Sequence, residues 1–143
     1  MSKKRILIVD DESSLTRVVR LNLEGTGRFE VRVENHAVNA LSAAKEFEPH
    51  LIVLDVMMPS MDGGDVKAQI RRNAKLKTTP IIFLTASVSP SEAGNGGFTS
   101  GGELFLGKPV STEKLVEVID QQIAAQSPDL PPVVSPPETR ASA

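Results

Sequence analysis

The chain carries, at residues 51–59, the sequence LIVLDVMMP, an apolar run of strand length that ends in one carboxylate and then meets a proline. A run this short and this apolar lacks a polar face, which is typical of a strand covered on both sides in a parallel sheet. An ionisable side chain is costly inside such a run, but at its carboxyl end it reaches the edge where open α/β sheets bind their ligands. Asp55 therefore either merely ends a strand or forms the centre of a functional site.

Other apolar runs end in a similar way. Residues 6–9 (ILIV) are followed by Asp10 and Asp11, and residues 81–84 (IIFL) are followed by Thr85. Residues 104–106 (LFL) are followed, after one glycine, by Lys108. Because the carboxyl ends of neighbouring parallel strands lie at one edge of a sheet, we expect these polar side chains to meet there.

Strand-like and helix-like segments alternate along the whole chain. Alternating apolar and charged residues predict a further, half-covered strand at residues 29–33. Apolar residues at helical spacing predict helices at 12–24 and 36–47, and a closing helix from an N-cap at Ser111 to about residue 125. Pro59 and Gly63-Gly64 predict a loop, followed by a short helix with Val66 and Ile70 on its inner face that ends near residues 71–73. This pattern is typical of a single doubly wound α/β fold, a five-stranded parallel sheet with helices on both faces. The alternation alone leaves the strand order open.

Two segments depart from this alternation. Half of the ten glycines fall within residues 94–102. Because a glycine inside a helix costs about 1 kcal/mol relative to alanine, we expect the fourth helix to be short or irregular, at most a short helix around residues 91–93 before a mobile loop. Residues 126–143 hold five of the ten prolines and predict an extended tail or linker, either solvated or bound by a partner. The chain thus divides into a domain at 1–125 and a tail at 126–143.

The composition sets limits on function and location. The formal net charge of −2 provides no overall field for nucleic acid or an anionic membrane, so we predict no direct binding to either. The chain has no cysteine, which excludes disulfides and thiolate metal sites. The apolar run behind Lys3, Lys4 and Arg5 is too short for a signal peptide or a membrane span. We therefore predict a cytoplasmic protein.

The polar residues expected at the sheet edge fit one kind of chemistry. Clustered carboxylates from Asp10, Asp11 and Asp55 repel one another, and a hard divalent cation relieves that repulsion. Mg²⁺ typically takes one or two carboxylates, keeps several waters and leaves room for a phosphate. With the hydroxyl of Thr85 and the charge of Lys108, these are the groups that transfer of a phosphoryl group to an aspartate needs.

Several motifs carry a resemblance to a known family. They are residues 6–11 (ILIVDD), 54–59 (LDVMMP) with 61–63 (MDG), 85–86 (TA) and 105–109 (FLGKP). In this order and at these spacings they resemble the receiver domains of bacterial two-component response regulators, the chemotaxis regulator among them, over about residues 3–125. The resemblance implies a flavodoxin-like strand order of 2-1-3-4-5, with residues 1–125 as the receiver domain.

The resemblance also implies a role for each acidic residue. Asp55 would be the phosphoacceptor. Asp11 and Asp55 would bind Mg²⁺ by their side chains, Asp10 would act mainly through a coordinated water, and the backbone carbonyl of Met57 would complete the protein ligands.

The remaining motif residues would handle the phosphoryl group and the response to it. Thr85 and the backbone N–H of Ala86 would hold phosphoryl oxygens, and Lys108 would pair with the phosphoryl group. Phe105 would be the aromatic switch that turns inward when Thr85 is drawn to the phosphate. His36 and His50 lie outside these motifs, and we expect His36 to be a surface residue.

The function implied is a phosphoacceptor response regulator, not a turnover enzyme. A sensor histidine kinase or a histidine phosphotransfer protein would supply the phosphoryl group, and an unidentified downstream protein would read the altered surface of a monomer or weak dimer. The alternative is a phosphorelay intermediate that passes the group on to a histidine phosphotransfer protein. A flavodoxin-like cofactor protein is disfavoured, because the chain has no tryptophan or tyrosine to stack on a flavin. Without an effector domain, the sequence represents either a stand-alone receiver or a fragment that ends in a linker.

Overall fold

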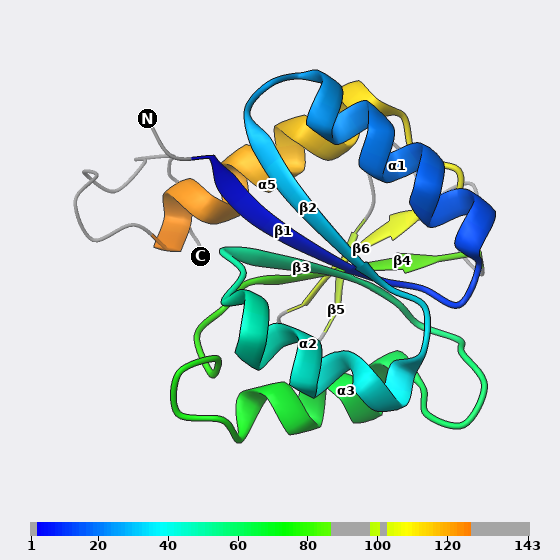
Figure 1. The fold of residues 1–143 in the computed structure, drawn as a ribbon, viewed down its shortest axis with the longest axis vertical. Helices are drawn as coiled ribbons and strands as arrows, with labels where there is room; N and C mark the ends of the chain where they lie inside the picture. The colour runs from blue at the N-terminus through cyan, green and yellow to red at the C-terminus, as the bar shows by residue number, and fades with distance from the viewer. Residues whose placement is uncertain (1–2, 87–97, 101–102, 127–143) are drawn as a thin grey trace.

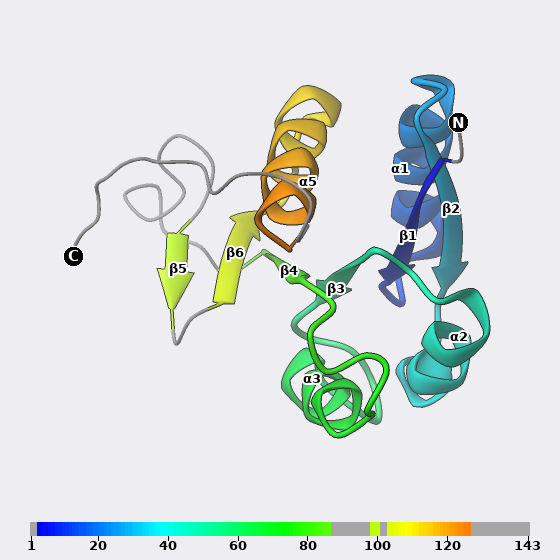
Figure 2. The ribbon, with the colours of Figure 1, turned by 90° about the vertical axis from the view of Figure 1, so that its left-hand side faces the viewer.

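The computed structural model describes residues 3–86, 98–100 and 103–126, and a mixed sheet of six strands runs through its centre. The strands are β1 (Lys4–Val9), β2 (Phe29–Glu34), β3 (Leu51–Asp55), β4 (Ile81–Thr85), β5 (Phe98–Ser100) and β6 (Glu103–Gly107). Figure 1 labels the strands, and Figure 2 shows their order across the sheet, which is β2-β1-β3-β4-β6-β5. The five predicted strands are β1, β2, β3, β4 and β6. They pair in parallel in the order β2-β1-β3-β4-β6, which is the predicted order 2-1-3-4-5 with β6 as the fifth strand, so this prediction is confirmed.

The strand β5 was not expected and corrects the five-stranded sheet. We predicted a loop beyond residue 93, but Phe98–Ser100 pairs antiparallel with β6, with Phe98 opposite Phe105 and Ser100 opposite Glu103. Residues 98–100 include a phenylalanine and a threonine, which favour strands. The surrounding glycines led us to predict a loop despite the strand propensity of these residues. The short helix predicted around residues 91–93 and the rest of the predicted loop lie outside the described residues.

Helices cover both faces of the sheet, as predicted. They are α1 (Ser13–Gly25), α2 (Ala40–Phe47) with a preceding 3₁₀ turn η1 (Ala37–Asn39), α3 (Gly63–Arg71) and α5 (Thr112–Gln126). Figure 2 shows α1 and α5 on one face and α2 and α3 on the other. Beyond Gln126, the predicted tail lies outside the described residues.

Helix starts follow from local capping. Asp62 accepts a hydrogen bond from the Asp65 N–H, and the Asp65 side chain accepts one from the Asp62 N–H, which is the capping box that begins α3. The predicted N-cap Ser111 accepts from the Lys114 N–H at 3.1 Å and begins α5. The helix predicted at 36–47 instead opens with the 3₁₀ turn η1.

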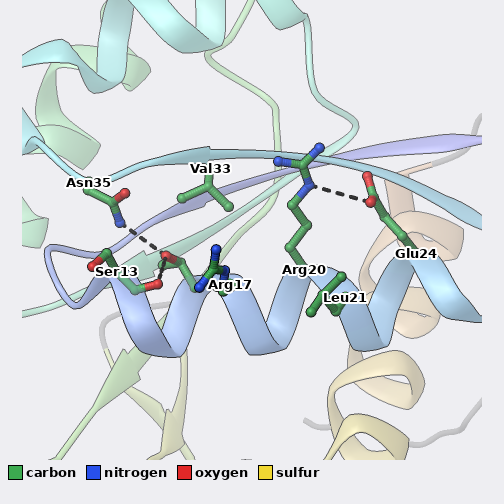
Figure 3. A pocket seen from close by; sticks show the side chains of 8 residues that line it. Ser13, Arg17, Arg20, Leu21, Glu24, Val33 and Asn35 are labelled. Carbon is green, nitrogen blue, oxygen red and sulfur yellow. Dashed lines mark hydrogen bonds and ion pairs between the residues drawn. The ribbon is translucent and has the colours of Figure 1, made fainter.

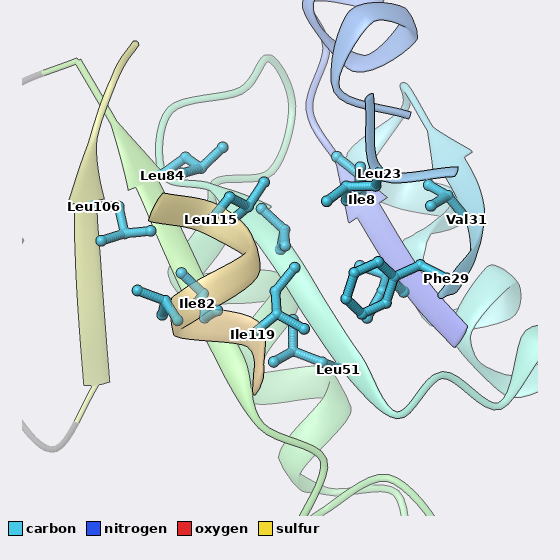
Figure 4. Close-up of a cluster of buried hydrophobic side chains, with 13 residues drawn as sticks. Ile8, Leu23, Phe29, Val31, Leu51, Ile82, Leu84, Leu106, Leu115 and Ile119 are labelled. Atoms are coloured by element: carbon cyan, nitrogen blue, oxygen red, sulfur yellow. The ribbon is translucent and has the colours of Figure 1, made fainter. Parts of the chain in front are cut away.

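The core lies in two layers because successive strand residues point to opposite faces. In β3, Leu51 and Val53 pack with α1 and α5, whereas Ile52 and Leu54 pack with α2 and α3. Figure 4 shows the first layer, in which Leu23 and Phe29 belong to the same buried cluster as Leu115 and Ile119 of the last helix. The four residues of β3 at positions 51–54 are all fully buried. This apolar run is therefore covered on both sides, as its composition predicted.

Candidate functional site

Three carboxylates meet at the carboxyl edge of the sheet. Asp10 and Asp11 follow β1, and Asp55 is the last residue of β3. One carboxylate oxygen from each lies within 4.8 Å of the others, and among the described residues this is the one group of three or more metal-ligating side chains. Asp10 and Asp55 are buried, with 1% and 6% exposure, whereas Asp11 is exposed to solvent. The sheet thus brings together the acidic residues that the sequence predicted there.

Lys108 enters the same cluster from the loop after β6. Its Nζ lies 2.8 Å from Oδ2 of Asp10 and 3.3 Å from Oδ1 of Asp55, and Glu12 is more distant at 3.8 Å. The backbone N–H of Lys108 donates to the Thr85 carbonyl at 2.9 Å, which ties this loop to the end of β4. The peptide bond between Lys108 and Pro109 is cis. One ammonium group therefore bridges two buried carboxylates.

Burial and charge shift the titration of this cluster. Burial, followed by repulsion from Asp10, raises the pKa of Asp55 above its ordinary value, and the opposing effect of Lys108 is smaller. Burial by itself would lower the pKa of Lys108, but the carboxylates of Asp10 and Asp55 outweigh it and raise the pKa of the lysine. Lys108 therefore keeps its proton more readily, and Asp55 loses its proton less readily, than each would in water.

The remaining predicted residues lie on β4, on β6 and in the loop after β3. Thr85 ends β4 beside β3 and is buried, and Ala86 follows it on the exposed side. Met57 lies in the loop after Asp55 with 71% of its surface exposed. Phe105 in β6 stacks on Phe83 of β4, with ring centroids 4.9 Å apart and planes at 16°. The topology thus places Thr85 next to the carboxylates and Phe105 one strand further along the sheet.

Sequence reasoning missed two residues that support the cluster. Asn35 donates from Nδ2 to the Asp10 carbonyl at 2.7 Å and to Thr16 Oγ1 at 3.1 Å, which ties β2 to the turn after β1. Figure 3 shows Asn35 at one end of a groove of about 480 Å³ between α1 and β2. Gly63 donates its N–H to the Val56 carbonyl at 2.8 Å, directly behind Asp55. Gly63 belongs to a quoted motif, but its spacing indicated only a loop; no sequence signal marks Asn35.

The donor set fits a hard divalent cation. The acidic cluster offers oxygen ligands, which Mg²⁺ prefers, and one lysine among three carboxylates leaves an excess of negative charge. Oδ2 of Asp10 is buried, and among the described residues the polar group nearest to it in the ion pairs is the Lys108 ammonium group at 2.8 Å. An oxygen of this kind gains from an added cation.

Neither histidine belongs to the acidic cluster, although His36 lines a hollow that Asp11 also lines. His36 is exposed, as predicted, and its backbone N–H donates to Glu34. His50 Nδ1 accepts from the Arg5 N–H at 2.9 Å, while the His50 N–H donates to the Arg5 carbonyl at 2.8 Å. This histidine therefore joins the starts of β1 and β3 at the opposite edge of the sheet.

Within the described residues, no helix is both long and apolar enough to cross a bilayer.

Comparison with known proteins agrees with this arrangement. Residues 6–120 match the model of the response regulator receiver domain family. The chain is 31% identical over 121 residues to the response regulator Rre1 of Synechocystis, covering 85% of this chain and 52% of the relative. It is 35% identical over 114 residues to the DNA-binding response regulator MtrA of Mycobacterium tuberculosis, covering 80% of this chain and 48% of the relative. The chain spans about half the length of these curated relatives.

Solved structures show the same likeness in three dimensions. A putative response regulator from Chloroflexus aurantiacus superposes with a TM-score of 0.73 at 31% identity, covering 86% of this chain and 99% of that one. The chemotaxis protein CheY4 of Vibrio cholerae gives a TM-score of 0.70 at 30% identity, covering 84% and 98%. The fold, the acidic edge and the family match together place this chain in the response regulator receiver domain family of two-component signalling.

Proposed function

We propose that Asp55 is the phosphoacceptor of this receiver domain and that its phosphorylation switches a protein-binding surface. The observation that supports this most directly is the position of the Lys108 ammonium group, which lies 3.3 Å from an oxygen of Asp55 and 2.8 Å from Asp10. A buried carboxylate next to a fixed cation is the arrangement that accepts a phosphoryl group and then holds the added charge.

The proposed reaction is an in-line displacement. An oxygen of ionised Asp55 attacks the phosphorus of a phosphohistidine, the new P–O bond forms, and the P–N bond to the imidazole breaks. The imidazole nitrogen leaves with the electron pair of that bond and takes up a proton. Lys108, the hydroxyl of Thr85 and the backbone N–H of Ala86 would neutralise the charge on the equatorial phosphoryl oxygens.

Asp11 and Asp55, with the backbone carbonyl of Met57, would hold Mg²⁺, and Asp10 would contribute mainly through a coordinated water. When bound, the ion would neutralise charge on the phosphoryl oxygens and the carboxylates. The chain's own part is to hold these oxygens together before the donor arrives: burial and the contact with Lys108 restrict Asp10 and Asp55.

The proposed response runs through Thr85 and Phe105. The hydroxyl of Thr85 would move towards the phosphoryl group, and Phe105 would turn inward into the space that Thr85 leaves. Phe105 is partly buried and stacked on Phe83, so its ring has a defined starting position. A shift between two such positions would change the surface that β6 presents to a partner.

A sensor histidine kinase or a histidine phosphotransfer protein would be the phosphoryl donor, as two-component signalling requires. Relatives such as MtrA are named DNA-binding regulators, yet the predicted absence of nucleic acid binding by this chain stays a prediction. Cytoplasmic location, a monomer or weak dimer, and a role as a signalling protein without substrate turnover also stay predictions.

The test is labelling of the purified chain with acetyl phosphate, with and without Mg²⁺, followed by intact mass. Wild type should gain one acid-stable, base-labile phosphoryl group only with Mg²⁺, and Asp55→Asn should gain none. Asp120→Asn is the matched control, because Asp120 is a solvent-exposed aspartate in α5 whose contact is Arg28. Labelling of Asp55→Asn to the same extent as wild type would overturn the proposal.

The relay alternative differs in what happens after phosphorylation. Incubating the phosphorylated chain with a histidine phosphotransfer protein should leave most of the group on Asp55 if the chain is an output switch. Rapid return of the group to a histidine, faster than hydrolysis, would favour the relay.

A further inference from the structure

A second hollow lies at the opposite edge of the sheet from the carboxylates. It has a volume of about 320 Å³, a largely apolar surface and walls formed by the end of α2 and the loop after α3. This volume is at the lower end of the range of small-molecule sites in proteins. The lining residues are Lys45, Glu48, Asn73, Ala74, Lys75 and Leu76. We call this hollow the Leu76 cavity.

Hydrogen bonds hold one wall of the Leu76 cavity in place. Oδ1 of Asn73 accepts from the backbone N–H groups of Lys75 at 2.9 Å and Leu76 at 3.2 Å, which fixes the turn. Arg71 Nη1 donates to the Thr79 carbonyl at 2.7 Å and braces the loop from behind. The side of the cavity formed by residues 73–76 is therefore shaped before any ligand arrives.

The other wall is held in a similar way. Arg5 Nε donates to the carbonyls of Phe47 at 3.0 Å and Glu48 at 2.9 Å, where the helix α2 ends. Glu48 adopts a left-handed conformation with φ of 52°, which turns the chain sharply towards β3. Because both walls are fixed, a ligand would lose little free energy in ordering the protein.

The charges on the rim indicate the chemistry of the ligand. Lys45 and Lys75 are exposed, and within the described part of the chain neither takes part in an ion pair. Their methylene stems can cover an apolar body while their ammonium groups stay in water. Glu48 is the one carboxylate among the lining residues, so two positive charges face one negative charge.

We propose that the Leu76 cavity binds a small amphiphilic anion, with an apolar body inside the cavity and a carboxylate paired with Lys45 and Lys75. Two ammonium groups without an ion-pair partner among the described residues, beside an apolar and preformed hollow, support this ligand class over a neutral or cationic one. The site belongs to the amino ends of the strands, so it is separate from the acidic cluster and independent of its proposed role.

The test is an NMR titration of the ¹⁵N-labelled full chain with three probes of equal chain length: octanoate, octan-1-ol and octylammonium. Octanoate should give saturable shifts centred on the amides of Ala74, Lys75 and Leu76. The alcohol should bind several-fold more weakly, and octylammonium most weakly. Absence of saturable octanoate shifts at these amides, or equal binding of octylammonium, would overturn the proposal.

Charge variants provide the second arm and keep the apolar stems. Lys45→Met and Lys75→Met should each weaken octanoate binding roughly two- to fivefold, as expected for one exposed ion pair. Glu48→Gln should strengthen it by a similar factor. Lys77→Met is the matched control, because Lys77 is exposed on the same segment but does not line the cavity. Octanoate affinity that ignores Lys45, Lys75 and Glu48 would also refute the assignment.

Discussion

Replacing Gly63 by alanine should destabilise the protein, although the residue lies in a helix. A Cβ atom at this position would lie 2.5 Å from the Asp55 carbonyl oxygen and 3.1 Å from both Val56 Cα and Phe83 Cε1. The first two are backbone atoms, which cannot rotate away from the new methyl group. The start of α3 or the end of β3 would therefore have to move.

The expected magnitude follows from three contributions. Overpacking of this kind typically costs about 1–3 kcal/mol. Movement of the helix would also weaken the hydrogen bond from the Gly63 N–H to the Val56 carbonyl, worth about 1 kcal/mol. The higher helix propensity of alanine returns at most about 1 kcal/mol, and less at the first position of a helix. We expect Gly63→Ala to lower the free energy of unfolding by about 2 kcal/mol.

The assay is urea unfolding followed by far-ultraviolet circular dichroism, because the chain has no tryptophan or tyrosine for fluorescence. With a slope of about 2 kcal/mol per M, the midpoint should fall by about 1 M. Gly64→Ala is the matched control: its Cβ would meet only Asp62 Oδ1 at 3.3 Å, so stability should be unchanged or slightly higher. An unaltered midpoint for Gly63→Ala, or an equal loss for Gly64→Ala, would refute this reasoning.

Three further predictions concern single side chains. The raised pKa of Asp55 means that its proton is held more tightly in the folded state, so stability falls as the pH rises through the folded pKa. Asp55→Asn should therefore be more stable than wild type at pH 7 in magnesium-free urea unfolding, and the difference should vanish at pH values below the ordinary aspartate pKa. A constant difference across pH would contradict this. Burial, followed by the charges of Arg5 and Lys4, lowers the pKa of His50 in the folded state. As the pH drops through the ordinary histidine range, the imidazole is therefore protonated in the unfolded state before it is protonated in the folded state, and the stability of the protein falls. His50→Gln should flatten that part of the stability curve between about pH 7.5 and 5, and an unchanged slope would count against the assignment. Met57, exposed beside Asp55, is proposed to limit attack of water on the acyl phosphate; Met57→Asn should then shorten the acyl-phosphate lifetime measured by intact mass, and equal lifetimes would sink the idea.

Much of the fold could be predicted because its strands are buried on both faces. A run such as ILIV or LIVL has no polar face, and it is distinguishable from a helix by its length and by the turn residues around it. The alternation of strands and helices predicted the parallel class, but the order 2-1-3-4-5 came only from the family resemblance. Local pattern does not determine which strand lies beside which, because that depends on packing between residues far apart in the chain.

The structure also corrects the sequence reasoning where a glycine-rich stretch was read as a loop. Residues 98–100 form β5 because their partner is β6, a strand whose other edge is already paired with β4. Helix propensity explained why a long helix was disfavoured there. It carried no information about an exposed sheet edge that a short segment could cover.

The geometry of the acidic cluster depends on strand register, which no single motif contains. Thr85 of β4 stands opposite Gly107 of β6, one residue before Lys108. A slip of one residue would send the side chains of β6 to the opposite faces of the sheet. It would also break the hydrogen bond between the Lys108 N–H and the Thr85 carbonyl. The stacked pair of Phe83 and Phe105, which face each other in the same register, opposes that slip. The aromatic residue expected to act as a switch therefore also helps to place the lysine beside Asp10 and Asp55.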